Sequence, residues 1–176
     1  LMTTGSHQTQ IYWVRGPQAN QLRIFPFAYL ILKDKWVPLA DAFLKYPEQV
    51  ENENLFWNFN CIQCHATAGQ SRPHVTGKTN TRVGELGIAC ESCHGPARNH
   101  VLINQDPLQR YQNHFRNKSD STIVNPNRES HRSSSQICGQ CHGIFYILDL
   151  DHAKQHGFQY RPGDDLEKTK PTIRPK

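Results

Sequence analysis

Three copies of one five-residue pattern, Cys-x-x-Cys-His, constrain this chain more than any other feature of its sequence. They are Cys61-Ile62-Gln63-Cys64-His65, Cys90-Glu91-Ser92-Cys93-His94 and Cys138-Gly139-Gln140-Cys141-His142. All six cysteines of the 176 residues lie in these copies. The pattern is typical of a c-type haem attachment site, where the two thiols form thioether bonds and the histidine supplies an axial nitrogen to iron.

A zinc site is the main alternative, because Cys-x-x-Cys pairs also supply thiolates to structural zinc. The pairs Cys61/Cys64 and Cys90/Cys93 could form one four-thiolate site. That site would leave the third pair without a partner, and neither zinc nor disulfides explain the three histidines. The sequence therefore favours three covalently attached haem c groups, with the cofactor-binding residues Cys61, Cys64, His65, Cys90, Cys93, His94, Cys138, Cys141 and His142.

His65, His94 and His142 are the predicted proximal metal ligands, and the second axial position of each iron needs a further donor. His131 precedes Cys138 by seven residues, which places it about 10 Å away on the same face of a helix, so it suits a neighbouring haem better than its own. On one continuous helix, His100 would point about 120° away from His94 and would also serve another haem.

Other histidines have weaker claims to iron. His7 lies beside a β-prone segment, which suggests an ordered ligand, although a frayed terminus explains it equally well. His152 and His156, spaced i and i+4 near the C-terminus, are better interpreted as a solvated pair than as metal ligands. His74 and His114 stay unassigned. The predicted metal ligands are therefore the three proximal histidines with His100, His131 and His7.

Composition agrees with a fold built around cofactors. Only 36% of the residues are hydrophobic, which is lean for a protein-only core, and porphyrins would supply additional apolar surface. The formal charge of +5 falls to about +2 when three ferric haems with ionised propionates add about −1 each. Plausible propionate partners are Arg98, Arg110, Arg116, Arg128 and Arg132, although a solvated surface position explains any one of them better. The sequence holds no block of like charges that would indicate nucleic-acid binding.

The fold class predicted is a multihaem cytochrome c, mainly α with much irregular coil, with a small N-terminal antiparallel β-meander and a core built around three covalent haems. The meander is expected at about residues 11–39, with Pro26 at an edge or a bulge. The haem-binding region is expected at about 55–150, and one trihaem domain over 1–166. Residues 167–176 read as an extended tail or linker.

Helix signals cluster around the second and third motifs. We expect a short helix at 40–45, a helix from Pro96 to about Gln105 that Pro107 terminates, and another that runs to Lys118. Asn125 and Pro126 look like an N-cap and a first helical position, opening one helix that carries His131 and the third motif. The aromatic residues before the first motif, Phe56, Trp57 and Phe59, are either core residues or porphyrin-stacking groups.

The expected location follows from the cofactor. No stretch is long and apolar enough to span a membrane; the best candidate, Ile24–Leu32, is short and contains a proline. Haem c is normally attached outside the cytoplasmic membrane, so we expect an exported chain that is periplasmic, extracellular or at the cell surface. Because Leu1 is not an initiator residue, we expect a processed or partial chain.

Several distinctive segments occur between about Thr3 and Leu166. They are Gly5-Ser6-His7, Tyr12-Trp13, Pro26-Phe27-Ala28-Tyr29-Leu30, Trp36-Val37-Pro38, Trp57-Asn58, Gly87-Ile88-Ala89-Cys90-Glu91-Ser92-Cys93-His94-Gly95-Pro96, His131-Arg132-Ser133-Ser134 and Arg161-Pro162-Gly163-Asp164-Asp165. Together they resemble bacterial multihaem cytochromes c related to the hydroxylamine-oxidoreductase-like superfamily, which includes the small tetrahaem electron carrier of nitrifiers.

The resemblance implies close-packed haem pairs, mostly bis-histidine iron and distal ligands at His7, His100 and His131. Such relatives carry further haem sites on both sides of this stretch, so the chain resembles a segment of a larger cytochrome, and His7 could ligate a haem outside it.

The function expected is electron transfer, because bis-histidine iron leaves no open position for a substrate. Alternatives are a haem enzyme with one open iron, acting on small nitrogen or sulfur compounds, and an interaction module that haems staple together. Expected partners are other redox proteins or cytochromes, further haem domains or copies of the same chain, with no nucleic acid.

Overall fold

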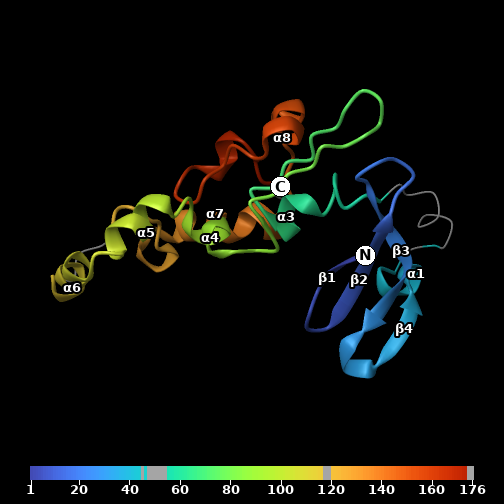
Figure 1. Cartoon of the computed structure of the whole chain (residues 1–176), viewed down its shortest axis with the longest axis horizontal. Helices are drawn as coiled ribbons and strands as arrows, with labels where there is room; N and C mark the ends of the chain where they lie inside the picture. The colour runs from blue at the N-terminus through green and yellow to red at the C-terminus, as the bar shows by residue number, and fades with distance from the viewer. Residues whose placement is uncertain (45, 47–54, 117–119, 174–176) are drawn as a thin grey trace. The chain divides into compact units, whose positions relative to one another are not determined.

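The computed structural model describes residues 1–44, 46, 55–116 and 120–173. The chain divides into two compact units (Figure 1). Unit 1 comprises Leu1–Gly87 with Lys154–Gly157, and unit 2 comprises Ile88–Ala153 with Phe158–Lys176. The first attachment motif lies in unit 1, and the second and third lie in unit 2.

Unit 1 is built on a four-stranded antiparallel sheet, drawn in blue in Figure 1. The strands follow chain order: β1 (Met2–Thr4), β2 (Thr9–Arg15), β3 (Leu22–Leu30) and β4 (Lys35–Pro38). β2 alternates by side-chain burial, with Ile11 and Trp13 buried on one face, as expected of a sheet covered on one side. The predicted β-meander is confirmed, but it begins at Met2 rather than near residue 11.

Pro26 lies in a bulge of β3, a strand that pairs with neighbours on both sides. Ile11 pairs with Ala28 and Trp13 with Ile24, so β3 uses two more residues than β2 between these two pairs. Pairing with β4 begins only at Phe27. Since proline has no N–H to donate, the bulge is the position in a central strand where it is tolerated.

The core of unit 1 lies under this sheet and includes the segment that precedes the first motif. Trp13, Ala28 and Trp57 are each at most 3% exposed and belong to one hydrophobic cluster with Leu39 and Ile62. Trp57 is thus a core residue in this structure. The short helix α1 (Leu39–Ala42) covers part of the predicted helix 40–45, and Lys45 lies outside the described residues. Additional elements of unit 1 are η1 (Ile31–Lys33), α3 (Ile62–His65) and the paired strands β5 (Ala66–Thr67) and β6 (Glu85–Leu86).

Unit 2 is made of short helices joined by irregular segments. In chain order they are α4 (Cys90–His94), α5 (Arg98–Asn104), α6 (Pro107–Phe115), η2 (Pro126–Arg128), α7 (His131–His142) and η3 (Leu166–Lys168), with α8 (Leu150–His156) running from this unit into unit 1. Among the described residues, no helix combines the length and the apolar character that crossing a membrane requires.

The helix after the second motif starts later than predicted. The chain leaves α4 through Gly95, whose φ of 77° lies in the region that favours glycine, and α5 starts at Arg98 rather than at Pro96. Pro107 does separate two helices, because it occupies the first turn of α6 while the Asp106 side chain caps that helix. The predicted extension of α6 to Lys118 reaches residues outside those described.

Asn125 and Pro126 do start a helical turn, but the single helix predicted from there to the third motif is wrong. The Asn125 side chain accepts from Asn127 N, which starts η2, and this turn ends at Glu129 with ψ of 163°. Ser130 then caps a separate helix, α7, by accepting from Ser133 N. Two N-caps in close succession therefore divide the segment into two helices.

The C-terminal segment up to Thr172 packs into unit 2 rather than extending as an arm. Tyr160, Leu166 and Lys170 are 5%, 1% and 1% exposed. Thr172 forms an antiparallel bridge with Phe145. The polar composition of this segment suggested an exposed arm. That prediction is wrong, because even the charged residue Lys170 is buried.

Unit 2 has a thin protein core. Ile137, Tyr160 and Leu166 are the buried apolar side chains among its described residues. By contrast, three successive apolar residues of α5, Val101, Leu102 and Ile103, are 49%, 55% and 37% exposed. A unit of this size ordinarily needs more apolar burial than its own side chains provide here.

Candidate haem sites

Each attachment motif forms one helical turn that ends at its histidine. α3 ends at His65, α4 at His94 and α7 at His142. In the first motif the turn is closed by His65 N, which donates to the carbonyl of Cys61 at 2.8 Å. Residues i, i+3 and i+4 of a helix lie on one face, so the spacing of each motif places two thiols and one imidazole together.

The six cysteines form no disulfide bond and differ in exposure. Cys90, Cys93 and Cys138 are exposed, whereas Cys61, Cys64 and Cys141 are half-buried. Cys61 packs against the core of unit 1. Burial, with a smaller contribution from Cys64, raises the pKa of the Cys61 thiol to about 11.

His94 is oriented by a main-chain carbonyl. Its Nδ1 lies 2.8 Å from the carbonyl oxygen of Val124, and Val124 N donates back to the carbonyl of His94 at 3.1 Å. A donated Nδ1–H fixes the tautomer and leaves the Nε2 lone pair for a metal. This is the arrangement that metal-ligating histidines usually have.

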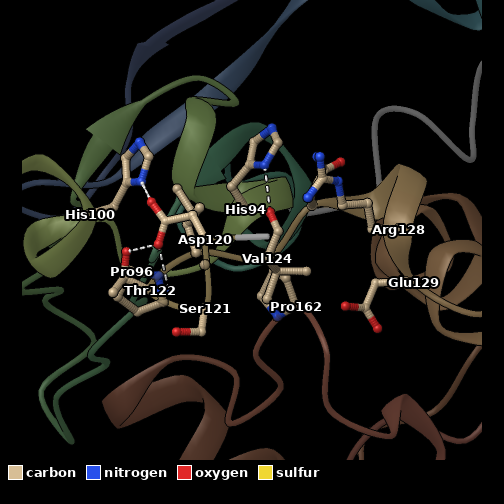
Figure 2. Close-up of a pocket in the computed structure, with 13 residues that line it drawn as sticks. His94, Pro96, His100, Asp120, Ser121, Thr122, Val124, Arg128, Glu129 and Pro162 are labelled. Carbon is tan, nitrogen blue, oxygen red and sulfur yellow. Dashed lines mark hydrogen bonds and ion pairs between the residues drawn. The ribbon is translucent and has the colours of Figure 1, made fainter. Parts of the chain in front are cut away.

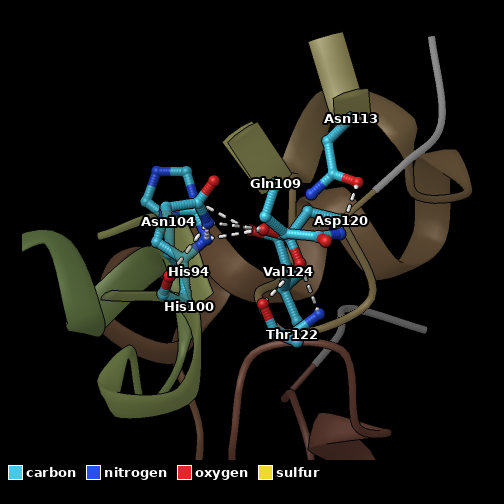
Figure 3. A network of polar contacts seen from close by, with 8 residues as sticks. All are labelled: His94, His100, Asn104, Gln109, Asn113, Asp120, Thr122 and Val124. Atoms are coloured by element: carbon cyan, nitrogen blue, oxygen red, sulfur yellow. Dashed lines mark hydrogen bonds and ion pairs between the residues drawn. The ribbon is translucent and has the colours of Figure 1, made fainter. Parts of the chain in front are cut away.

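His100 is oriented by a carboxylate. Its Nδ1 lies 2.8 Å from Oδ2 of Asp120, and Asn104 Nδ2 donates to the same oxygen at 3.2 Å (Figure 3). The hydroxyl and the backbone N–H of Thr122 both donate to Oδ1 of Asp120. The Thr122 hydroxyl, followed by the backbone bond and the bonds from His100 and Asn104, holds the pKa of Asp120 well below its usual range, so the carboxylate stays ionised.

His94 and His100 line the same pocket of about 630 Å³ together with Asp120, Val124 and Arg128. Figure 2 shows the two imidazole rings pointing the same way, each with its Nδ1 turned back toward its acceptor. Two axial ligands of one iron must approach from opposite sides of a porphyrin. The arrangement would therefore suit two different irons. The 120° rotation predicted for one continuous helix does not apply, because α4 and α5 are separate helices.

His131 and His142 occupy the two ends of α7. Eleven residues of helix separate them by roughly 16 Å along the axis, so the two histidines would not hold the same iron. Both are exposed, as is His65. His7 is also exposed, and its Nδ1 lies 2.9 Å from the Ser6 hydroxyl oxygen.

Within the ranges that the structure describes, no group of three or more His, Cys, Asp and Glu side chains is arranged to hold a metal ion by itself. Each motif instead supplies one histidine and two thiols on one face of a helix.

The sequence did not reveal the groups that orient these histidines. Asp120 and Thr122 form an Asx-turn, which the pattern Asp-Ser-Thr could have indicated locally. Nothing local links Asp120 to His100, twenty residues earlier in the chain. The Val124 carbonyl carries no side-chain signal at all, and only the tertiary fold brings it to His94.

Comparison with known families gives a match over part of the chain. Residues 39–95, which contain the first two attachment motifs, match the family described as cytochrome c554 and c-prime. A search of curated proteins gave no match. The match thus concerns c-type cytochromes, whereas the wider hydroxylamine-oxidoreductase-like relationship stays a prediction.

Two solved structures resemble the fold. The outer cell wall cytochrome OcwA is similar over 94% of this chain with a TM-score of 0.58 and 20% identity. An undecahaem cytochrome from the S-layer of Carboxydothermus ferrireducens is similar over 85% of this chain and 20% of its own, with a TM-score of 0.48 and 16% identity. The chain has a multihaem cytochrome c-like fold, and it spans about a third of OcwA, 31% of that chain.

Proposed function

We propose that this chain is an electron-transfer module carrying three covalent haem c groups, one at each Cys-x-x-Cys-His motif, within a trihaem region of residues 1–166. The observation that carries the proposal is the common local fold of the motifs, each a helical turn that ends at its histidine. Haem c supplies one-electron redox chemistry when bound. The chain's own residues would fix the spacing, the axial ligands and the electrostatic surroundings of the irons.

The residues of unit 2 fit such a group. The thiols of Cys90 and Cys93 are exposed and therefore accessible for thioether bonds. Exposed apolar side chains lie on both sides of this motif in the chain, with Ile88 62% exposed before it and Leu102 55% exposed after it. An apolar ring system covering these side chains would supply the burial that this unit otherwise lacks.

His100 and His131 are proposed as distal ligands, and His7 as a third. Support for His100 is strongest, because Asp120 takes its Nδ1–H and leaves Nε2 for iron. Support for His131 is its distance from His142 along one helix, which directs it to an iron other than that of its own motif. Iron with two histidines has no free position, which favours an electron carrier over a catalyst.

The proposed partners are other redox proteins, further haem domains or copies of this chain. The proposed location is outside the cytoplasmic membrane, periplasmic or at the cell surface. The similarity to an outer cell wall cytochrome over a third of its length is compatible with a module within a larger electron-transfer assembly.

The mass of the intact native protein and a pyridine haemochrome assay test this proposal together. We expect three haems per chain and two in the double variant Cys138→Ala/Cys141→Ala. The reduced wild-type protein should bind no carbon monoxide, because every iron is six-coordinate. Fewer than three haems in wild type would contradict the trihaem assignment. Stoichiometric carbon monoxide binding would contradict full bis-histidine ligation and favour an enzyme with an open iron.

A further inference from the structure

Lys170 is the least exposed charged residue identified in the described part of the chain, at 1% relative exposure. Its Nζ lies over the ring of Phe145 at 3.8 Å and over the ring of Phe158 at 3.9 Å from the centroids. The two aromatic faces stabilise an ammonium group that is expensive to withdraw from water. This buried cation plays no part in the function proposed above.

Lys170 is anchored to the third attachment motif. Its Nζ donates to the main-chain carbonyl of Gln140 at 2.5 Å. Gln140 is the residue between the two thiols of Cys138 and Cys141 that immediately precedes the second. The ammonium group is therefore fixed against the turn of helix from which the third haem would hang.

Gln140 also connects the third motif to the second. Its side-chain Nε2 donates to the carbonyl of Ser92 at 2.8 Å, and Ser92 lies between Cys90 and Cys93. The main chain of the two attachment helices is thus joined through one glutamine side chain. The cation of Lys170 lies on the third-motif side of this junction.

We propose that Lys170 sets the reduction potential of the haem at Cys138, Cys141 and His142, raising it above the value that a neutral residue would give. This inference rests on the proposed function. Reduction of a ferric haem adds one electron and lowers the charge of the site by one. A fixed positive charge nearby stabilises the reduced form relative to the oxidised form, and in a buried site water and salt screen it little.

The electrostatic effect of Lys170 should differ between the haems. Because electrostatic energy falls with distance, Lys170 acts most strongly on the haem of the motif that it contacts. The haem of the second motif, joined through Gln140 and Ser92, feels the charge less. Lys170 therefore shifts the distribution of an electron shared between these two haems toward the third.

Potentiometric titration of the haem-loaded protein, followed by absorption and by nuclear magnetic resonance of the haem methyl groups, tests the inference. The variant Lys170→Met removes the charge and keeps most of the length of the side chain. We expect one component to move to lower potential, and to be the component that is missing from Cys138→Ala/Cys141→Ala. The other components should move less. Lys168→Met, at an exposed position two residues away, is the matched control and should leave every potential unchanged.

Lys170→Gln separates charge from hydrogen bonding, since the amide can still donate to the Gln140 carbonyl. Equal shifts in the Met and Gln variants support an effect of charge. Unchanged potentials in both, a shift in the Met variant alone, or loss of the third haem in both would overturn the inference, since the lysine would then act only in holding the segment together. These results leave three haems in wild type, whereas failure of the proposed function lowers that number.

Discussion

Nδ1 of His100 lies 2.8 Å from a carboxylate oxygen of Asp120, and three further hydrogen bonds from Asn104 and Thr122 hold that carboxylate in place. The ring therefore donates from Nδ1 and presents Nε2 outward. A carboxylate behind a ligating histidine increases the basicity of the ring and fixes its orientation. His100 thus already has the orientation that its proposed role as an iron ligand requires.

Asp120→Asn should raise the reduction potential of one haem. The neutral amide makes the His100 ring a weaker electron donor, so the ferric state loses stabilisation. A redox titration measures the change. Asp164→Asn, at an exposed carboxylate of the same unit, is the control and should leave the potentials unchanged. An identical titration curve for wild type and Asp120→Asn would exclude His100 from the iron.

The contribution of Asp120 to the free energy of unfolding should depend on pH only under acidic conditions. Its pKa is depressed in the folded protein, so its contribution is fully present above the unfolded pKa of about 3.9 and is lost as pH falls further. We expect Asp120→Asn to cost about 1.5–3 kcal/mol at neutral pH, as for other hydrogen bonds to charged groups. Calorimetric melting should show a constant difference between the two proteins from pH 8 to 5 that shrinks below about pH 4.

Replacing His100 or His131 by alanine should convert one haem in each variant to the high-spin state. Loss of one axial imidazole leaves a five-coordinate or water-bound iron, which electron paramagnetic resonance and the absorption spectrum detect. Added imidazole should restore the low-spin spectrum. His114→Ala is the matched control, because its ring packs edge-on against Phe115 and has no predicted iron. Low-spin spectra in both variants would contradict this ligand assignment.

Cys61 should react more slowly than Cys90 in a chain produced without haem. Burial raises the pKa of Cys61 to about 11, so little of it is thiolate at pH 8, whereas Cys90 is exposed. We expect alkylation by iodoacetamide to be roughly 10–100-fold slower at Cys61, with the difference narrowing as pH rises toward 10. Peptide mass spectrometry after timed quenching gives both rates, and equal rates would contradict the packing of Cys61 against the core.

Trp13→Ala should lower the free energy of unfolding much more than Trp36→Ala. Trp13 is 2% exposed and donates from Nε1 to the Thr4 hydroxyl, so its removal leaves a cavity and should cost about 3–5 kcal/mol. Trp36 is 49% exposed and contacts the rings of Tyr12 and Tyr29, so its removal should cost about 1–2 kcal/mol. Scanning calorimetry measures both, and similar losses would contradict the assignment of the buried face of the sheet.

The sequence predicted those parts of the fold that local patterns encode. The attachment motifs, the antiparallel meander, the bulge at Pro26 and the separation of helices at Pro107 all follow from spacing or from the missing N–H of proline. The later start of α5 and the division at Ser130 were not predicted. There, several cap signals compete within a few residues, and the tertiary structure decides between them.

The contacts that orient the candidate ligands depend on residues far apart in the chain. Asp120 contacts His100 across twenty residues. Lys170 likewise contacts Gln140, a residue of the third motif, across thirty. No periodicity encodes such pairs. The C-terminal segment was predicted to be an extended arm for a related reason, since its polar composition suggested solvent although two phenylalanine rings lie against Lys170.

The anchoring of Lys170 to Gln140 has a consequence for the order of assembly. Ribosomes make the chain from its N-terminus, so Cys138 and Cys141 emerge before Lys170, which follows Gln140 by thirty residues. Until Lys170 has been made, the third motif lacks the hydrogen bond from Lys170 to Gln140 that holds it in the folded unit. The contact between Lys170 and Gln140 can therefore form only after the third motif and the thirty residues that follow Gln140 have been made.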